Sequence, residues 1–143
     1  MKIQVETIFS RKRALIDVRS PGEFIHGHIP HALNLPLFSD DERKEVGITY
    51  KKFGKREAIE KGLELVGFHK LVQEIRRLEL PNAIDIYCAR GGMRSSSVAW
   101  LFELLGYEVT VIDGGYKSYR GWALKQLSQS YSLFVLGGET GSG

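Results

Sequence analysis

The sequence is poor in cysteine and has no long apolar run. Its 143 residues include a single Cys, which excludes an internal disulfide framework and any Cys-rich zinc site. No apolar stretch approaches the about 20 residues that a membrane-spanning helix needs. Residues 1–13 lack the apolar core and the small-residue cleavage site of a signal peptide. These absences predict a protein of the reducing cytoplasm that does not associate with membranes.

What is present suits a folded domain with a core, because 43% of the residues are hydrophobic and 26% are charged. The formal net charge is +3, and the basic residues are clustered, notably at 11–13 and 51–56. Such clusters attract polyanions such as RNA, although ordinary solvated surfaces are the favoured explanation from charge alone.

Apolar runs that alternate with helical patterns predict an α/β fold. Strands are expected at 14–19, 83–88, 107–113 and 132–138, with a short extended segment within 28–36. The Pro-Gly pair at 21–22 indicates a turn. Parallel strands joined by helices place those helices on both faces of the sheet.

The helix signals are capping residues and apolar spacing. Ser39 is the expected N-cap of one helix, with Glu42 as its capping-box partner. Two amphipathic helices are expected to meet near Gly67, and two more are expected from about Ser95 and over 116–127. The result is a helical insertion at about 39–80.

The single cysteine lies in "YCARGGMRSSS", where Cys88 ends a strand and a helix follows. The adjacent glycines Gly91 and Gly92 let successive N–H groups turn inward and form an anion-binding nest. Arg90 and Arg94 are available to neutralise a bound anion. A helix N-terminus near arginines lowers the pKa of a thiol, so we expect a nucleophilic thiolate rather than an inert buried Cys.

The spacing Cys88 to Arg94 is C-x5-R, followed by Ser95. Cysteine-dependent phosphatases use this arrangement, so phosphate-ester chemistry is a rival interpretation. Such a phosphatase needs a general acid on a nearby loop. Asp40, Asp41 and Glu42 are possible acids, but helix capping explains them more simply.

Three segments, at 17–36, 87–95 and 111–119, together resemble a rhodanese domain. The resemblance spans residues of about 10 to 127 and implies an α/β fold with a parallel five-stranded sheet. It also implies that Cys88 carries a transferable sulfur or selenium as a persulfide or its selenium analogue, and that Asp17, Arg19 and Glu23 are supporting polar residues. The implied anion cradle consists of Ala89, Arg90, Gly91, Gly92, Met93, Arg94 and Ser95.

Two features depart from the usual rhodanese pattern. The loop is one residue longer than in many single-domain rhodaneses, as in the rhodanese-fold phosphatases of the cell cycle. His31 stands where the pattern "GHIPGA" has Gly.

The residues 88–120, with the insertion, are similar to the tRNA 2-selenouridine synthase family. This resemblance implies a transferase that uses selenophosphate as co-substrate and converts 2-thiouridine at the tRNA wobble position to 2-selenouridine. We interpret the longer loop as a cradle sized for a tetrahedral phosphorus anion. The alternatives are the phosphatase and a generic thiosulfate sulfurtransferase.

The family joins its rhodanese domain to a P-loop domain, and "LFVLGGETGSG" fits the start of one. Gly138, Gly141 and Gly143 belong to a G-x-x-x-x-G segment that stops before the Lys and Ser/Thr of a Walker A motif. We therefore expect a rhodanese-like domain at 1–130 and a truncated P-loop at 131–143. The rest of the P-loop domain would follow in cis or as a separate chain.

The remaining candidates have weaker signals. No bound cofactor or metal is expected, since the four His have no accompanying ligands. Trp100 and Trp122 are expected in the core. Tyr116 and Tyr119 follow a strand on the expected side of the site, and stacking on a nucleobase is their less favoured role.

Overall fold

A computed structural model describes residues 2–134 and 137–138. Its centre is a sheet of five strands, all parallel, in the spatial order β1-β5-β4-β2-β3. The strands are β1 (Lys2–Ile3), β2 (Ala14–Asp17), β3 (Leu33–Asn34), β4 (Ala83–Tyr87) and β5 (Glu108–Ile112). The predicted α/β class and the parallel five-stranded sheet are confirmed.

Successive residues of a strand point to opposite faces of the sheet. Both faces carry apolar side chains here, and helices cover each of them. On one face, Ile84 and Ile86 of β4 pack with α4 (Phe68–Arg77) and α5 (Met93–Leu104). On the other face, Tyr87 packs with the 3-10 helix η1 (Val5–Ser10), α1 (Pro21–His26) and α6 (Gly115–Leu127). Cys88 belongs to the first face.

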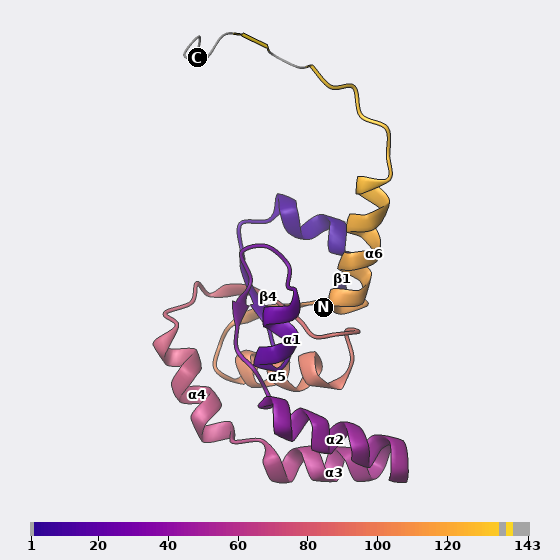
Figure 1. The fold of residues 1–143 in the computed structure, drawn as a ribbon. Helices are drawn as coiled ribbons and strands as arrows, with labels where there is room; N and C mark the ends of the chain where they lie inside the picture. Colours follow the sequence, from indigo (N-terminus) through magenta and orange to yellow (C-terminus); the bar gives the residue numbers. More distant parts are fainter. Residues whose placement is uncertain (1, 135–136, 139–143) are drawn as a thin grey trace.

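The helical insertion is confirmed and consists of α2 (Asp40–Phe53), α3 (Lys55–Leu65) and α4. Helix α2 begins with the expected capping box, in which the Ser39 hydroxyl accepts from the Glu42 N–H and the Glu42 carboxylate accepts from the Ser39 N–H. In Figure 1, α2 and α3 lie side by side below the sheet, whereas α4 returns the chain to it. The insertion therefore adds a two-helix unit beside the domain.

Two local predictions were wrong. The Pro-Gly pair opens helix α1 instead of a turn, because Ser20 caps the helix and Pro21 takes its first position, where no N–H is needed. Trp100 is 58% exposed on α5, outside the core, whereas Trp122 packs partly buried against the second cluster.

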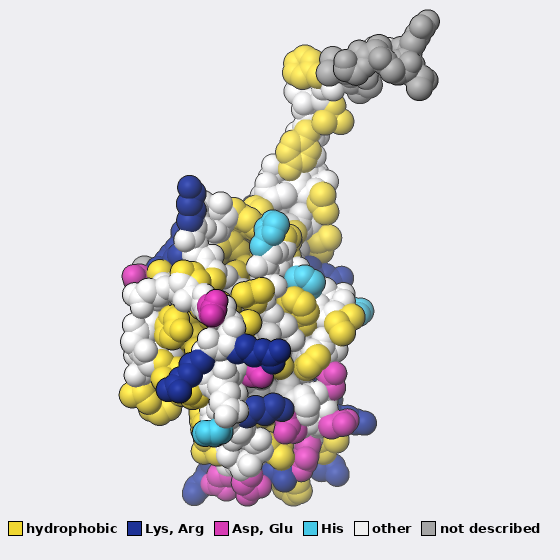
Figure 2. Space-filling model, turned by 90° about the vertical axis from the view of Figure 1, so that its left-hand side faces the viewer, with side chains coloured by type: hydrophobic (Ala, Val, Ile, Leu, Met, Phe, Trp, Pro, Cys, Tyr) yellow, Lys and Arg dark blue, Asp and Glu magenta, His cyan; other side chains and the backbone are white. Residues whose placement is uncertain are grey.

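After α6 the chain leads away from the sheet (Figures 1 and 2). A strand was expected at 132–138, but residues 132–134 and 137–138 form none, and the rest of that segment lies outside the described residues. A strand needs a neighbour to pair with, and no described strand pairs with 132–134. Hydrophobic side chains on this segment are exposed, as Figure 2 shows.

No helix within the described residues is both long and apolar enough to cross a membrane.

Candidate active site

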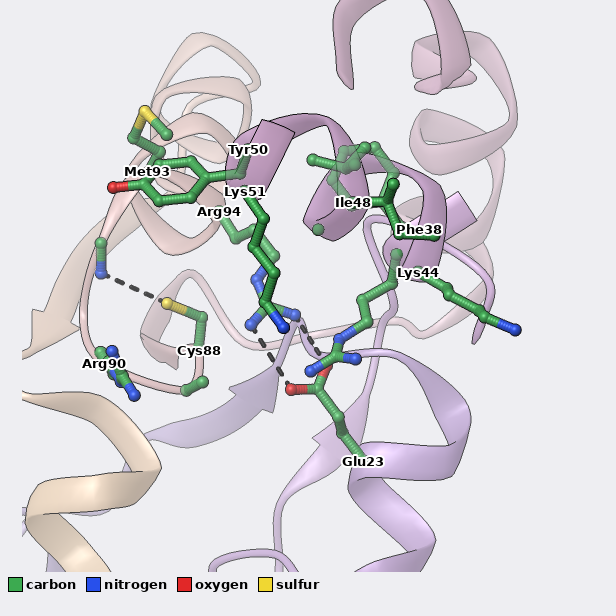
Figure 3. Close-up of a pocket in the computed structure, with 15 residues that line it drawn as sticks. Glu23, Phe38, Lys44, Ile48, Tyr50, Lys51, Cys88, Arg90, Met93 and Arg94 are labelled. Atoms are coloured by element: carbon green, nitrogen blue, oxygen red, sulfur yellow. Dashed lines mark hydrogen bonds and ion pairs between the residues drawn. The ribbon is translucent and has the colours of Figure 1, made fainter. Parts of the chain in front are cut away.

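Cys88 follows β4 directly and its side chain is 3% exposed. The N–H of Gly92 donates to Sγ over 3.3 Å, and the Ser95 hydroxyl lies 3.2 Å from the sulfur. Both partners belong to the turn that opens α5, so the sulfur faces the N-terminal end of that helix (Figure 3).

The pKa of the Cys88 thiol is lowered, as expected. Burial alone would raise it, but the Ser95 hydroxyl and the backbone N–H groups of Arg90, Gly92 and Ser95 outweigh burial. The arginine side chains were expected to contribute part of this effect. In the structure the hydroxyl and the backbone N–H groups supply it instead.

The cysteine loop is held from behind by the start of α6. The N–H groups of Tyr116 and Lys117 donate to the carbonyl oxygens of Cys88 and Ala89, over 2.9 and 3.0 Å. This close approach requires Gly115, since a side chain there would collide with the Cys88 carbonyl. Gly91 has φ 64°, which favours glycine, and a Cβ there would lie 2.9 Å from the Gly114 nitrogen.

The two loop arginines behave differently. Arg90 is exposed. Arg94 is partly buried and donates to Glu23 over 2.7 Å, and Arg43 of α2 lies 3.6 Å from the same carboxylate. Burial raises the pKa of Glu23, but the Arg94 guanidinium, the Ser20 N–H and Arg43 together lower it by more, so the net direction is down. Glu23 is therefore a carboxylate that joins α1, α2 and α5 at the site.

A cavity of about 620 Å³ opens over the Cys88 loop. Its floor includes Cys88, Gly92 and Arg94, and its opposite wall is helix α2 (Figure 3). Five of the lining side chains are cationic, and one, Glu23, is a carboxylate. These cations are Arg43, Lys44, Lys51, Arg90 and Arg94. The cavity therefore suits an anionic ligand next to the thiol.

The structure brings most of the expected site residues to this cavity. Ala89, Arg90, Gly92, Met93 and Arg94 line it with Cys88 and Glu23. Gly91 and Ser95 are buried behind the loop.

Asp17 and Arg19 do not line the cavity. They form a buried ion pair at 2.6 Å, and the Arg19 guanidinium lies 4.0 Å from the centre of the Tyr116 ring. They therefore support the start of α6, which in turn holds the Cys88 loop. Tyr116 is occupied by this contact, which disfavours the suggested stacking on a nucleobase.

The structure also shows how His31 is accommodated where the usual rhodanese pattern has Gly. His31 has φ 65°, in the left-handed region that favours glycine. The glycine of the usual pattern suits this backbone, and His31 adopts it at a conformational cost.

Helix α2 also contributes to the site, which was not predicted from the sequence. Lys44, Gly47, Ile48 and Lys51 all line the cavity and are spaced as one face of a helix. This spacing was a usable signal, but the direction in which the face points depends on how α2 packs.

Among the described residues, no three His, Cys, Asp or Glu side chains gather as they would around a metal ion. Gly138 is described and exposed. Gly141 and Gly143, and with them the rest of the predicted P-loop, lie outside the described residues.

A family profile described as "Rhodanese-like domain" matches residues 4–121. The chain is 44% identical over 138 residues to a tRNA 2-selenouridine synthase of Sulfurovum sp., covering 90% of this chain and 37% of that protein. It is 41% identical over 145 residues to the tRNA 2-selenouridine synthase of Shewanella denitrificans, covering 96% and 39%. The chain thus spans less than half the length of these relatives.

Among solved structures, the chain resembles the N-terminal domain of a putative ATP/GTP binding protein from Clostridium difficile 630. The TM-score is 0.78 with 41% identity, over 87% of this chain and 99% of that one.

Proposed function

Because the chain belongs to the rhodanese-like domain family, we propose that it carries sulfur or selenium on Cys88 for the modification of tRNA. The observation that carries this proposal is the position of the thiol. Its sulfur lies under a cationic cavity, with the Gly92 N–H and the Ser95 hydroxyl as partners that favour the thiolate. A nucleophile and an anion-binding site therefore share one loop.

The first step is attack of the Cys88 thiolate on the terminal chalcogen of an anionic donor. With thiosulfate, a new S–S bond forms, the old one breaks, and sulfite leaves with the electron pair. With selenophosphate, an S–Se bond forms, the Se–P bond breaks, and phosphorus leaves with the electron pair, taking up a proton to give phosphite. Arg90 and the loop N–H groups would hold the departing oxyanion.

The acceptor is assigned from the relatives named tRNA 2-selenouridine synthase. We propose 2-thiouridine at the tRNA wobble position as the acceptor and selenophosphate as the donor. Release of selenium from its bond to Cys88 requires an electron pair, which a thiol reductant would supply. The proposal also includes a P-loop domain as a partner, in cis or as a separate chain.

The phosphatase alternative is less favoured because, among the described residues, the cavity offers no suitable general acid. Of the described residues that line it, only Glu23 has a carboxyl group, and the pairing of Glu23 with Arg94 lowers its pKa. A proton donor for an alkoxide leaving group needs a raised pKa. Asp40 instead accepts from the Gly22 N–H, and Glu42 caps α2.

Intact-protein mass spectrometry tests the proposal. The protein is incubated separately with selenophosphate, thiosulfate and a phosphate ester, with Cys88→Ser as the control. We expect a gain of one selenium or one sulfur that is absent from the control. A phosphoryl adduct on Cys88 would instead establish the phosphatase alternative, and no adduct with either chalcogen donor would refute the proposal.

A further inference from the structure

We infer that helix α2 provides a binding site for the acceptor nucleotide, in which Tyr50 stacks on the base and Lys51 contacts its phosphate. The inference rests on the proposed function for the identity of the ligand. The site itself is argued from the cavity, from its lining side chains and from one glycine of α2.

The cavity is larger than the anionic donor requires. At about 620 Å³ it falls within the range that holds drug-sized molecules, whereas a tetrahedral oxyanion fills only a small part of such a space. In the proposed function, Arg90 and the loop N–H groups already hold that anion. The remaining volume lies between the cysteine loop and α2, so a second and larger ligand fits above the first.

The side chains that α2 presents to this volume are of two kinds. Tyr50 is 54% exposed and lines the cavity together with Met93 of α5, which is 44% exposed. Lys44 and Lys51 project from the same helix, and Figure 3 shows Lys51 extending into the cavity. An exposed aromatic ring beside lysines is the combination with which proteins bind unpaired nucleotides, because the ring stacks on the base and the lysines neutralise the phosphates.

Gly47 adds a second observation. It lies within α2, has no atom within 4 Å of the position of a Cβ, and lines the cavity between the levels of Lys44 and Tyr50. A glycine inside a helix destabilises it relative to alanine, and here no neighbouring group requires one. Its missing side chain keeps the wall of the cavity open, which is consistent with a flat ligand against α2.

The aromatic part of the inference is tested by RNA binding. The probe is a fluorescently labelled anticodon stem-loop with 2-thiouridine at the wobble position, and the dissociation constant is measured by anisotropy at fixed salt. Tyr50→Ala is expected to weaken binding by roughly 5- to 150-fold, the loss typical of one stacked base. Tyr50→Phe should bind like the unchanged protein. Phe53→Ala is the matched control, since Phe53 is 67% exposed on the same helix but does not line the cavity.

The proposed contact with phosphate is tested with two adjacent lysines, Lys51 and Lys52. Lys51→Gln should weaken binding and reduce the slope of log affinity against log salt by about one, as expected for one lost phosphate contact. Lys52→Gln is its control, because Lys52 does not line the cavity. Gly47→Leu should weaken binding while raising the urea midpoint of unfolding, a combination that a purely structural role would not produce.

Several results would overturn the inference. The first is failure of the unchanged protein to bind the RNA probe. The second is an equal loss of RNA affinity in Tyr50→Ala and Phe53→Ala. The third is an equal loss of RNA affinity in Lys51→Gln and Lys52→Gln. Loading of Cys88 is measured by mass in the same variants. Loading without Tyr50-dependent RNA binding refutes this site alone, whereas Tyr50-dependent binding without loading refutes the carrier function alone.

Discussion

The contribution of Ser95 to the reactivity of Cys88 leads to a quantitative prediction. Ser95→Ala removes the hydroxyl 3.2 Å from the sulfur. Ser95 is fully buried, so bulk water does not reach the vacated position. The thiolate would keep the Gly92 N–H as a donor but would lose its only side-chain hydrogen bond among the described contacts.

The size of the effect follows from the charge on the sulfur. A hydrogen bond to a charged group contributes about 1.5–3 kcal/mol, which corresponds to a roughly 10- to 150-fold change in an equilibrium. We expect the lower end, because the Ser95 hydroxyl has a single proton and the Gly92 carbonyl, to which it donates over 2.9 Å, competes with the sulfur for it. The thiolate-to-thiol ratio at a given pH should therefore fall by about tenfold.

The assay is the rate of alkylation by iodoacetamide as a function of pH, which reports one site because the chain has a single cysteine. The Ser95→Ala profile should move to higher pH. Ser96→Ala is the control, since its hydroxyl donates to the same Gly92 carbonyl over 3.3 Å and has no described bond to the sulfur. Coincident profiles for Ser95→Ala and the unchanged protein would refute the reasoning.

The lowered pKa of Cys88 also predicts how the stability of the folded protein depends on pH. The pKa of Cys88 in the folded protein lies below its ordinary value of 9.0. Between the two values the folded protein has lost a proton that the unfolded chain retains, so stability rises with pH through this window. The contribution is complete above 9.0 and is lost as the pH falls through the folded value. Urea unfolding across this range should show a smaller rise for Ser95→Ala.

Three further predictions concern the cavity and the backbone. Gly92→Ala should change the free energy of unfolding by less than about 0.5 kcal/mol but slow the loading of Cys88 by narrowing the cavity. Gly91→Ala should lower the free energy of unfolding by at least about 1–2 kcal/mol, because its φ is positive and the added Cβ would lie 2.9 Å from the Gly114 nitrogen. Urea unfolding measures the stability of both variants, and mass spectrometry measures their loading. Glu23→Gln should be less stable than the unchanged protein at neutral pH. This difference should shrink on acidification, because the carboxyl pKa is lowered from 4.5 and its stabilisation is lost as the pH falls through the folded value. A constant difference in urea unfolding would contradict this. His31→Gly should gain up to about 1 kcal/mol by relieving the left-handed backbone, less the entropy of the added glycine, and any loss in urea unfolding would contradict the assignment of strain.

The sequence by itself determined the features that depend on neighbouring residues. Apolar runs marked β2, β4 and β5, because the last two residues of β2 and the last four of β4 and of β5 are buried. The capping box at Ser39 and the junction of two helices near Gly67 were also readable, since capping and helical spacing act within a few residues. The loop around Cys88 was found in the same way, with its glycines and its place after a buried strand.

Tertiary structure alone decided which distant residues complete the site. Arg94 pairs with Glu23, 71 positions away, and Asp17 and Arg19 support α6 instead of facing the cavity. Helix α2 becomes a wall of that cavity only because the insertion folds back over the cysteine loop. Local patterns show which residues share one face of a helix. The element against which that face packs depends on the folding of the whole chain, since many pairings of elements satisfy the same periodicity.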